Sequence, residues 1–301
     1  MPANGSRFHV VEQGPAGSDG LDGAPVVLLL HGFPQFWWAW RHQLPALADA
    51  GYRAVAMDLR GYGGSDKPPR GYDTPTLAAD VAGVIRSLGA ADAVVVGLGW
   101  GGWLAWSMPS LAPRTTRAVA VLGAPHPLQA LTALAAPRRA QGLRHVLSFQ
   151  APVLPERRLQ RGGLVADLLR AWSAPGGSFP DDAAVLRYTQ AMRIPSVAHC
   201  SLEYYRWAVR SRVRPDGLRF ARAVRRTTSV PVLQLHGSAD GQVSPGVARG
   251  SSRFVRGSYR WEMLDGPGHF LPEEAPAQTT ALLLDWLAAL PPSPSPGMFT
   301  N

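Results

Sequence analysis

The sequence predicts an α/β fold, a mostly parallel, doubly wound sheet with a helical segment inserted into it. Two observations lead to this prediction. Short apolar, β-rich runs alternate with helical stretches up to about residue 123, and the alternation stops there and resumes near residue 227. Strands that are apolar on both faces and joined by helical crossovers are typical of parallel sheets. A length of 301 residues with 46% hydrophobic residues is sufficient for one large buried core.

The expected elements follow from these runs in chain order. Strands are predicted at Val26–Leu30, Arg53–Asp58, Ala93–Gly97, Ala118–Leu122 and Val230–His236, and helices at Leu77–Leu88, Trp103–Leu111 and Thr279–Leu290. Residues 1–123 and 227–290 therefore form the expected core. Residues 124–226 form the inserted segment, here called the cap, and residues 291–301 are expected to be a disordered, proline-rich tail.

The basic charge of the chain is concentrated in the cap. Residues 124–226 contain 17 arginines and 6 acidic residues, whereas the remainder contains 13 basic and 15 acidic residues. A solvated basic face is one interpretation, and a surface that attracts anionic substrates or partners is the other. No nucleic-acid-binding motif accompanies the charge, so no nucleic-acid function is expected.

Composition excludes several other classes of protein. Cys200 is the only cysteine, so no disulfide can form within the chain. No run approaches the ~18 apolar residues of a membrane helix, and the first residues lack the features of a secretory signal. We therefore expect a cytoplasmic monomer or homodimer that acts on a small molecule and does not bind membranes. No metal-ligand spacing or dinucleotide fingerprint is present, so no metal and no cofactor are expected.

Four candidate segments follow predicted strands, at the sheet edge where open α/β sheets bind ligands. The first two are His31-Gly32-Phe33-Pro34 and the segment 58–66. The third is Gly97-Leu98-Gly99-Trp100-Gly101-Gly102. The fourth joins Asp240, in Gly-Ser-Ala-Asp, to His269, in Gly-Pro-Gly-His-Phe.

In order and spacing these segments resemble the α/β-hydrolase superfamily and, within it, the epoxide-hydrolase-like branch. The resemblance covers nearly the whole chain and implies an α/β-hydrolase fold with an inserted helical cap. In that family the sequence Gly-x-nucleophile-x-Gly forms a sharp turn from strand to helix. The nucleophile position here is Gly99, and no Asp, Ser or Cys lies between Val94 and Trp106. The usual covalent intermediate therefore cannot form at this turn.

The resemblance also implies roles for the remaining residues of the core. His269 matches the general base, and Asp240 matches the acid that orients it. The backbone N–H groups of Phe33 and Trp100 match an oxyanion hole.

In the cap, the resemblance points to two hydrogen-bond donors. Epoxide hydrolases use two cap tyrosines that donate to the epoxide oxygen. Tyr205, in Glu-Tyr-Tyr-Arg, matches one of them, and His145 stands where the other would be. His31, Pro34 and Trp37 are expected to belong to the pocket.

Three functions remain open at this point. In the first, the protein is a weak or altered hydrolase in which His269, oriented by Asp240, activates water without a nucleophile. In the second, it is an inactive pseudoenzyme that binds a small apolar or anionic ligand in the capped pocket. In the third, it is a decayed paralogue with neither role.

Overall fold

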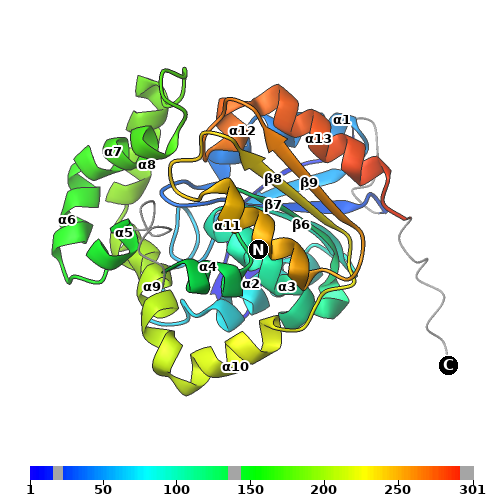
Figure 1. The fold of residues 1–301 in the computed structure, drawn as a ribbon, viewed down its shortest axis with the longest axis horizontal. Coiled ribbons are helices and arrows are strands. Elements are labelled where there is room, and N and C mark those ends of the chain that lie inside the picture. The colour runs from blue at the N-terminus through cyan, green and yellow to red at the C-terminus, as the bar shows by residue number, and fades with distance from the viewer. Residues whose placement is uncertain (16–22, 135–143, 292–301) are drawn as a thin grey trace.

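A seven-stranded sheet forms the centre of the computed structural model, which describes residues 1–15, 23–134 and 144–291 (Figure 1). Six of the strands are parallel, and only the first in sequence, at one edge, runs antiparallel to its neighbour. In spatial order the strands are β3 (Val10–Gln13), β5 (Arg53–Met57), β4 (Val26–Leu30), β6 (Ala93–Leu98), β7 (Thr116–Leu122), β8 (Val232–Gly237) and β9 (Tyr259–Leu264). The short strands β1 (Pro2–Ala3) and β2 (Ser6–Arg7) pair separately.

The central strands are apolar because helices cover both faces of the sheet. Every residue of β4, β6 and β8 is buried. One face carries α1 (Gln43–Asp49) and α13 (Pro276–Ala288), and the other carries α2 (Thr74–Ser87) and α3 (Trp100–Leu111) (Figure 1). The shorter core elements are η1 (Trp37–Trp40), η2 (Pro113–Thr115), α11 (Pro245–Arg249), η5 (Gly250–Phe254) and α12 (Leu271–Glu274).

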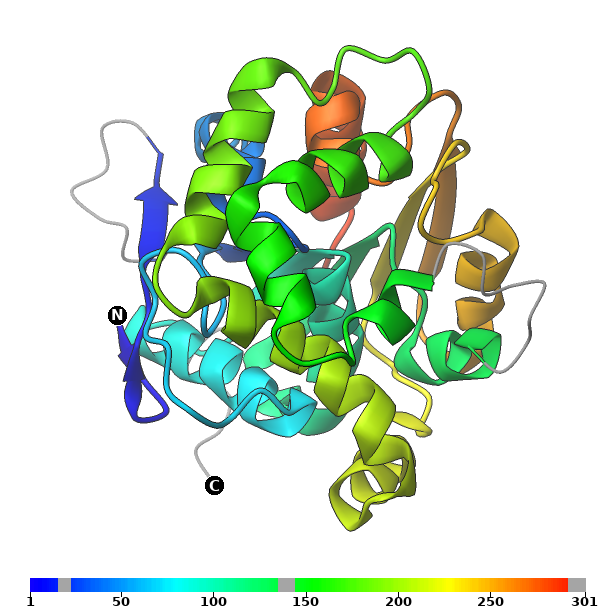
Figure 2. The same ribbon diagram turned by 90° about the vertical axis from the view of Figure 1, so that its left-hand side faces the viewer.

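Between β7 and β8 the described residues form helices joined by loops. These helices are α4 (Pro127–Leu134), α5 (Arg144–Ser148), α6 (Leu154–Arg161), α7 (Gly163–Trp172), α8 (Asp182–Arg193), α9 (Val197–Arg210), η4 (Ser211–Val213) and α10 (Pro215–Val224). Helices α5 to α9 lie beyond the carboxyl ends of the strands, whereas α10 packs against α3 and α4 (Figures 1 and 2). The cap therefore covers the sheet edge where the candidate segments emerge.

The predicted strands and helices are present with shifted ends, and several short elements and both edge strands of the large sheet were not predicted. Helix α3 begins at Trp100 rather than Trp103, because Gly101 and Gly102 are helical although glycine has a low helix propensity. The edge strands β3 and β9 were not predicted, because polar and charged residues interrupt them and they are only partly buried. Of the expected tail, residues 292–301 lie outside the described residues.

Candidate active site

The turn between β6 and α3 is the sharp strand-to-helix elbow that the sequence predicts. Gly99 has φ +54° and ψ −112°, a backbone conformation that favours glycine. Two residues after Gly99, tight packing requires glycine at position 101, because a Cβ at Gly101 would lie 2.1 Å from the carbonyl oxygen of Leu30. The elbow is therefore sharp and tightly packed, and its central residue has no side chain.

The imidazole of His269 faces Gly99 at the centre of the elbow. A Cβ built on Gly99 would lie 3.2 Å from Nε2 of His269 and 3.6 Å from Cα of Gly32. On its other side the ring contacts Gly123, where a Cβ would lie 3.0 Å from Nδ1. His269 thus lies against two glycines, and its Nε2 has no hydrogen-bond partner among the residues that the structure describes.

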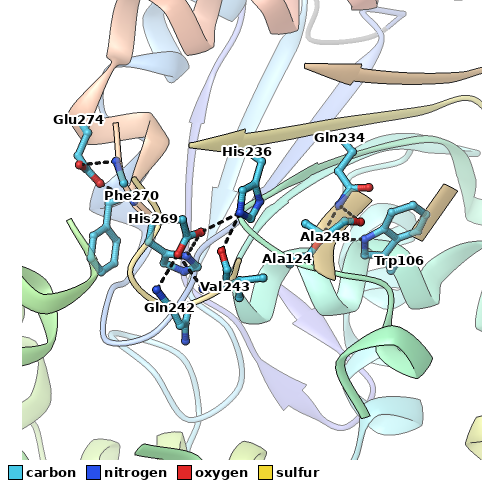
Figure 3. A network of polar contacts seen from close by, with 12 residues as sticks. Trp106, Ala124, Gln234, His236, Gln242, Val243, Ala248, His269, Phe270 and Glu274 are labelled. Atoms are coloured by element: carbon cyan, nitrogen blue, oxygen red, sulfur yellow. Dashed lines mark hydrogen bonds and ion pairs between the residues drawn. The ribbon is translucent and has the colours of Figure 1, made fainter. Parts of the chain in front are cut away.

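Asp240 orients this imidazole (Figure 3). Oδ2 of Asp240 lies 2.9 Å from Nδ1 of His269, and Oδ1 accepts hydrogen bonds from the backbone N–H groups of Gln242 and Val243 at 2.8 and 2.9 Å. The Asp240 side chain is completely buried. Because the carboxylate accepts a hydrogen bond from the N–H at Nδ1, the other ring nitrogen, Nε2, carries no proton and is the basic one. The predicted acid and base are therefore in contact.

A second histidine lies beside the same carboxylate, and the sequence analysis did not identify it. Nε2 of His236 donates to the carbonyl oxygen of Val243 at 2.9 Å and lies 3.5 Å from Oδ2 of Asp240 (Figure 3). Burial lowers the pKa of His236, so the ring is neutral at physiological pH. Its place in β8, four residues before Asp240, is the signal that could have identified it.

The end of α7 holds the loops that carry the acid and the base. The carbonyl oxygen of Trp172 accepts from the backbone N–H of His269 at 2.8 Å and from that of Gly241 at 3.4 Å. The Glu274 carboxylate accepts three backbone N–H groups at 2.8 Å, those of Ala174 in the cap and of Gly268 and Phe270 beside His269. The cap therefore fixes the backbone of His269 as well as covering the site.

A cavity of about 100 Å³ opens between the elbow and the cap. Its walls are mainly apolar, and Gly99, Trp100 and Gly123 line it from the core. Its polar members among the described residues are His145, Tyr205, Gln242 and Ser244. The sequence analysis predicted the first two of these and missed Gln242, whose Nε2 lies 3.4 Å from Nε2 of His145, and Ser244.

Tyr205 is one of the residues that line this cavity, and its hydroxyl is buried beside it. Its ring packs edge-on against Phe33 and Trp100, with centroids 5.4 and 5.0 Å away. The hydroxyl is buried and makes no hydrogen bond of acceptable geometry with the described residues. Burial raises the pKa of Tyr205, and the indole of Trp100, which can only donate, lowers it in part. The phenol therefore stays protonated and has a proton to donate.

The other predicted donors lie close to Tyr205. The ring of His145 is 5.5 Å from that of Tyr205, at an interplanar angle of 85°. The backbone N–H groups of Phe33 and Trp100 have no acceptor within the described part of the chain. The Gly101 N–H donates to the carbonyl oxygen of His31 at 3.1 Å, which ties the loop after β4 to the elbow.

His31, Pro34 and Trp37 were also expected at the pocket, and they are not among the residues that line this cavity. The His31 side chain links the loops after β4 and β5. Its Nδ1 donates to the Gly32 carbonyl oxygen at 2.8 Å, and its Nε2 accepts a hydrogen bond from the Leu59 N–H at 3.1 Å. The N–H of Trp37 donates to Asp58, and its side chain lines a separate hollow. His31 and Pro34 lie in the loop after β4, and Trp37 begins the helix η1.

Two further properties concern the described residues only. They contain no group of three or more His, Cys, Asp or Glu side chains placed to hold a metal ion. Of their helices, none is both long and apolar enough to cross a membrane.

Comparison with known proteins agrees with this geometry. The sequence model of the family described as "alpha/beta hydrolase fold" matches residues 25–276. This chain belongs to the α/β-hydrolase family. Epoxide hydrolase A of Mycobacterium tuberculosis is 35% identical to it, over 96% of this chain and 97% of that protein. The AB hydrolase superfamily protein YfhM of Bacillus subtilis is 30% identical, over 94% of this chain and 95% of that protein.

Solved structures place this α/β hydrolase in the epoxide-hydrolase-like branch. The crystal structure of epoxide hydrolase A from Mycobacterium thermoresistibile superposes with a TM-score of 0.79 at 29% identity, covering 97% of this chain and 98% of that one. The fold and the branch implied by the sequence motifs are therefore confirmed.

Proposed function

We propose that this α/β hydrolase opens epoxide substrates slowly and without a covalent enzyme intermediate, by attack of water that His269 activates. One observation carries the proposal: Gly99, which Nε2 of His269 faces, and Tyr205 line the same cavity. A base and an acid are the two groups that ring opening by water requires.

The proposed step moves two protons and exchanges one C–O bond. Nε2 of His269 takes a proton from water, and the water oxygen bonds to one epoxide carbon. The ring C–O bond breaks, and its oxygen takes the phenol proton of Tyr205, which gives a diol. Asp240 stabilises the imidazolium, and the N–H groups of Phe33 and Trp100 stabilise developing negative charge. Proton exchange with solvent then restores His269 and Tyr205.

A slow reaction is expected because the nucleophile is absent. In a serine protease, removal of the nucleophile costs ~10⁶ in turnover, and the remaining groups retain ~10³–10⁴ over water. Here the proposed acid, base and N–H donors remain, so we expect a turnover rate about 10³–10⁴ above that of the uncatalysed reaction in water.

Single-turnover hydrolysis in H₂¹⁸O tests the proposal. We expect ¹⁸O in every diol molecule of the first turnover and no adduct on the protein by mass spectrometry, because the oxygen comes directly from water. His269→Gln should abolish turnover of a fluorogenic epoxide, whereas His42→Gln, at an exposed histidine beside α1, should not. Equal activity of His269→Gln and the parent would overturn the proposal.

A second candidate function is ligand binding without turnover. It is favoured by the position of His269, whose side chain is only 2% exposed and is not part of the cavity wall. Saturable quenching of Trp100 and Trp103 fluorescence by an apolar epoxide that is not consumed would favour this function. A chain that neither binds nor turns over such ligands would be a decayed paralogue.

The variant Gly99→Asp separates these outcomes. Its Cβ requires a shift of His269 by a few tenths of an ångström, because the contact at 3.2 Å is tight. Turnover by Gly99→Asp alone would favour a binder with a preserved site, and turnover by the native chain would favour the water mechanism.

A further inference from the structure

We propose that His236 is a positioning residue for the candidate active site. Its imidazole N–H holds the turn that carries Asp240, so that one carboxylate oxygen of Asp240 faces His269. The expected effect on turnover rests on the proposed function, whereas the hydrogen-bond geometry does not. Four features of the structure support this role.

The first feature is the turn formed by residues 240–243. Oδ1 of Asp240 accepts hydrogen bonds from the backbone N–H groups of Gln242 and Val243, at 2.8 and 2.9 Å. Because Oδ1 is occupied in this way, Oδ2 is the oxygen that meets Nδ1 of His269, at 2.9 Å. The direction of the carboxylate therefore depends on where the backbone of this turn lies.

His236 holds the far end of the same turn. Its Nε2 lies 2.9 Å from the carbonyl oxygen of Val243 and 3.5 Å from Oδ2 of Asp240 (Figure 3). Val243 is thus bonded on both sides, through its N–H to Asp240 and through its carbonyl oxygen to His236. These contacts form one continuous path from strand β8 to the imidazole of His269.

The second feature is the protonation state that these contacts require. Both neighbours of Nε2 are oxygen atoms that can only accept, so Nε2 is the nitrogen that carries the proton. Burial lowers the pKa of His236, against the opposing effects of Asp240 and the Val243 carbonyl group, so the ring is neutral. A donor directed at Oδ2 in a site without water also stabilises the ionised form of Asp240.

The third feature is the rigid setting of the ring. His236 belongs to β8, in which every residue is buried, and its side chain is completely buried. The ring stacks on Trp261 of the adjacent strand β9, with centroids 5.8 Å apart and an interplanar angle of 20°. A ring fixed by a strand and by stacking presents its N–H in one direction.

The fourth feature is a cost that packing alone does not explain. Nδ1 of His236 is buried and has no hydrogen-bond partner among the described residues. An apolar side chain at this position would avoid the desolvation of that nitrogen. The donor at Nε2 is what distinguishes histidine from an apolar residue here, and its acceptors belong to the turn that carries the acid.

The tautomer can be tested on the native chain. The ¹⁵N chemical shifts of ring nitrogens distinguish the Nε2–H form, the Nδ1–H form and the protonated ring. The chain has eight histidines, and loss of one set of signals in His236→Gln assigns His236. We expect the neutral Nε2–H form. Either of the other two forms would overturn the proposal.

Two variants at position 236 separate the donor from the ring. His236→Phe keeps a ring that can stack on Trp261 and removes the donor, whereas His236→Gln places an amide NH₂ group close to the position of Nε2. We expect the Nδ1–H proton resonance of His269, assigned by its loss in His269→Gln, to shift in His236→Phe and to be retained in His236→Gln. Turnover should fall about tenfold in kcat for His236→Phe with KM unchanged, as for loss of one hydrogen bond, and His236→Gln should restore most of it.

His126→Phe is the matched control. His126 is also a buried histidine that stacks on an aromatic ring, that of Phe254 at 3.9 Å, and no hydrogen bond joins its side chain to Asp240 or His269 among the described residues. Its substitution should leave the His269 resonance in place. Thermal melts establish that the variants are folded, and His236→Leu, which also lacks a donor, replaces His236→Phe if the larger ring prevents folding.

The remaining outcomes decide between the donor and packing. An unchanged His269 resonance and an unchanged kcat in His236→Phe would overturn the proposal. Equal losses in His236→Phe and His236→Gln would also overturn it, because they would show that the shape of the ring matters and the donor does not. A shifted resonance in a chain that turns over no epoxide contradicts only the proposed function, since the resonance reports the contact of Asp240 with His269 directly.

Discussion

Two features of the elbow favour glycine at position 99: its backbone dihedral angles and its close contact with His269. Its φ of +54° is unfavourable for other residues, and the contact distance of 3.2 Å to His269 is shorter than a Cβ comfortably allows. Glycine relieves backbone strain at the elbow and lets the base lie close to it. Glycine at this position is therefore expected to stabilise the fold relative to any residue with a side chain.

Gly99→Ala is expected to lower the free energy of unfolding by about 1 kcal/mol or more, because alanine at positive φ is strained. Urea denaturation measures this value. Gly246→Ala in α11 is the control, since a Cβ there contacts nothing within 4 Å and the backbone has no positive φ. That variant should be neutral or slightly stabilising. Equal effects of the two substitutions would contradict the strain argument.

Tyr205→Phe is expected to reduce epoxide turnover by about 10²–10⁴ without loss of stability. The hydroxyl has no hydrogen bond to lose within the described residues, so its removal from a buried site is neutral or stabilising. The neighbouring Tyr204 is the matched control, because its hydroxyl donates to the Arg60 carbonyl oxygen at 2.7 Å. Tyr204→Phe should cost about 1 kcal/mol of stability. A large stability loss in Tyr205→Phe would show that its hydroxyl is structural.

At the scale of elements, the end of α7 and the loop before α12 act as one unit. The Glu274 carboxylate joins them by accepting hydrogen bonds from three backbone N–H groups. The carbonyl oxygen of Trp172 accepts a further hydrogen bond from the backbone N–H of His269. Close packing is part of the joint, because a Cβ on Gly268 would lie 2.6 Å from the same Trp172 oxygen. Glu274 is therefore a positioning residue that acts on the reaction through His269.

Glu274→Gln is expected to lower stability by about 1–3 kcal/mol, because the amide NH₂ group faces N–H donors that need acceptors. It should lower kcat more than it weakens binding of an apolar ligand, since the cavity walls are unchanged. Glu262→Gln, at a half-exposed ion pair with Arg260, should change stability by less than about 1 kcal/mol. If kcat and ligand affinity of Glu274→Gln both equal those of the parent, the positioning role is wrong.

At the scale of the whole molecule, a buried carboxyl group joins the core to the cap. Glu273 of α12 accepts hydrogen bonds from Tyr188 of α8 at 2.6 Å and from Gln35 at 3.2 Å, and it pairs with Arg41. Burial raises the pKa of Glu273 to about 7, against the opposing effects of Arg41, Tyr188 and Gln35. The ionised form is therefore disfavoured at this contact.

This contact predicts a pH dependence of stability. Between pH 4.5 and about 7 the folded protein keeps a proton on Glu273 that the unfolded chain has lost. Stability therefore falls as the pH rises through this range, by roughly 3 kcal/mol at most. Glu273→Gln should remove this slope in urea denaturation from pH 5 to 8, and Glu262→Gln should keep it. A parallel pH profile for Glu273→Gln and the parent would refute the assignment.

The sequence by itself determined the five central strands of the sheet, the position of the helical segment between them and the pairing of Asp240 with His269. Strand runs such as Val26–Leu30 are apolar at every position because both faces are covered, and this pattern is local in the sequence. Asp240 and His269 were found because their order along the chain matches a family pattern, and they lie 2.9 Å apart. The absence of a nucleophile at Gly99 is also a property of the sequence alone.

Only the tertiary structure decided what surrounds these residues. The hydrogen bond from His269 to Trp172 and the cap–core cluster at Glu273 join residues 85 to 238 positions apart in the sequence. The tertiary structure also brought Arg212 and Arg253 to one hollow. Such contacts depend on how helices pack and which way side chains point. Local residue patterns specify helices and strands, but they do not specify these long-range pairings.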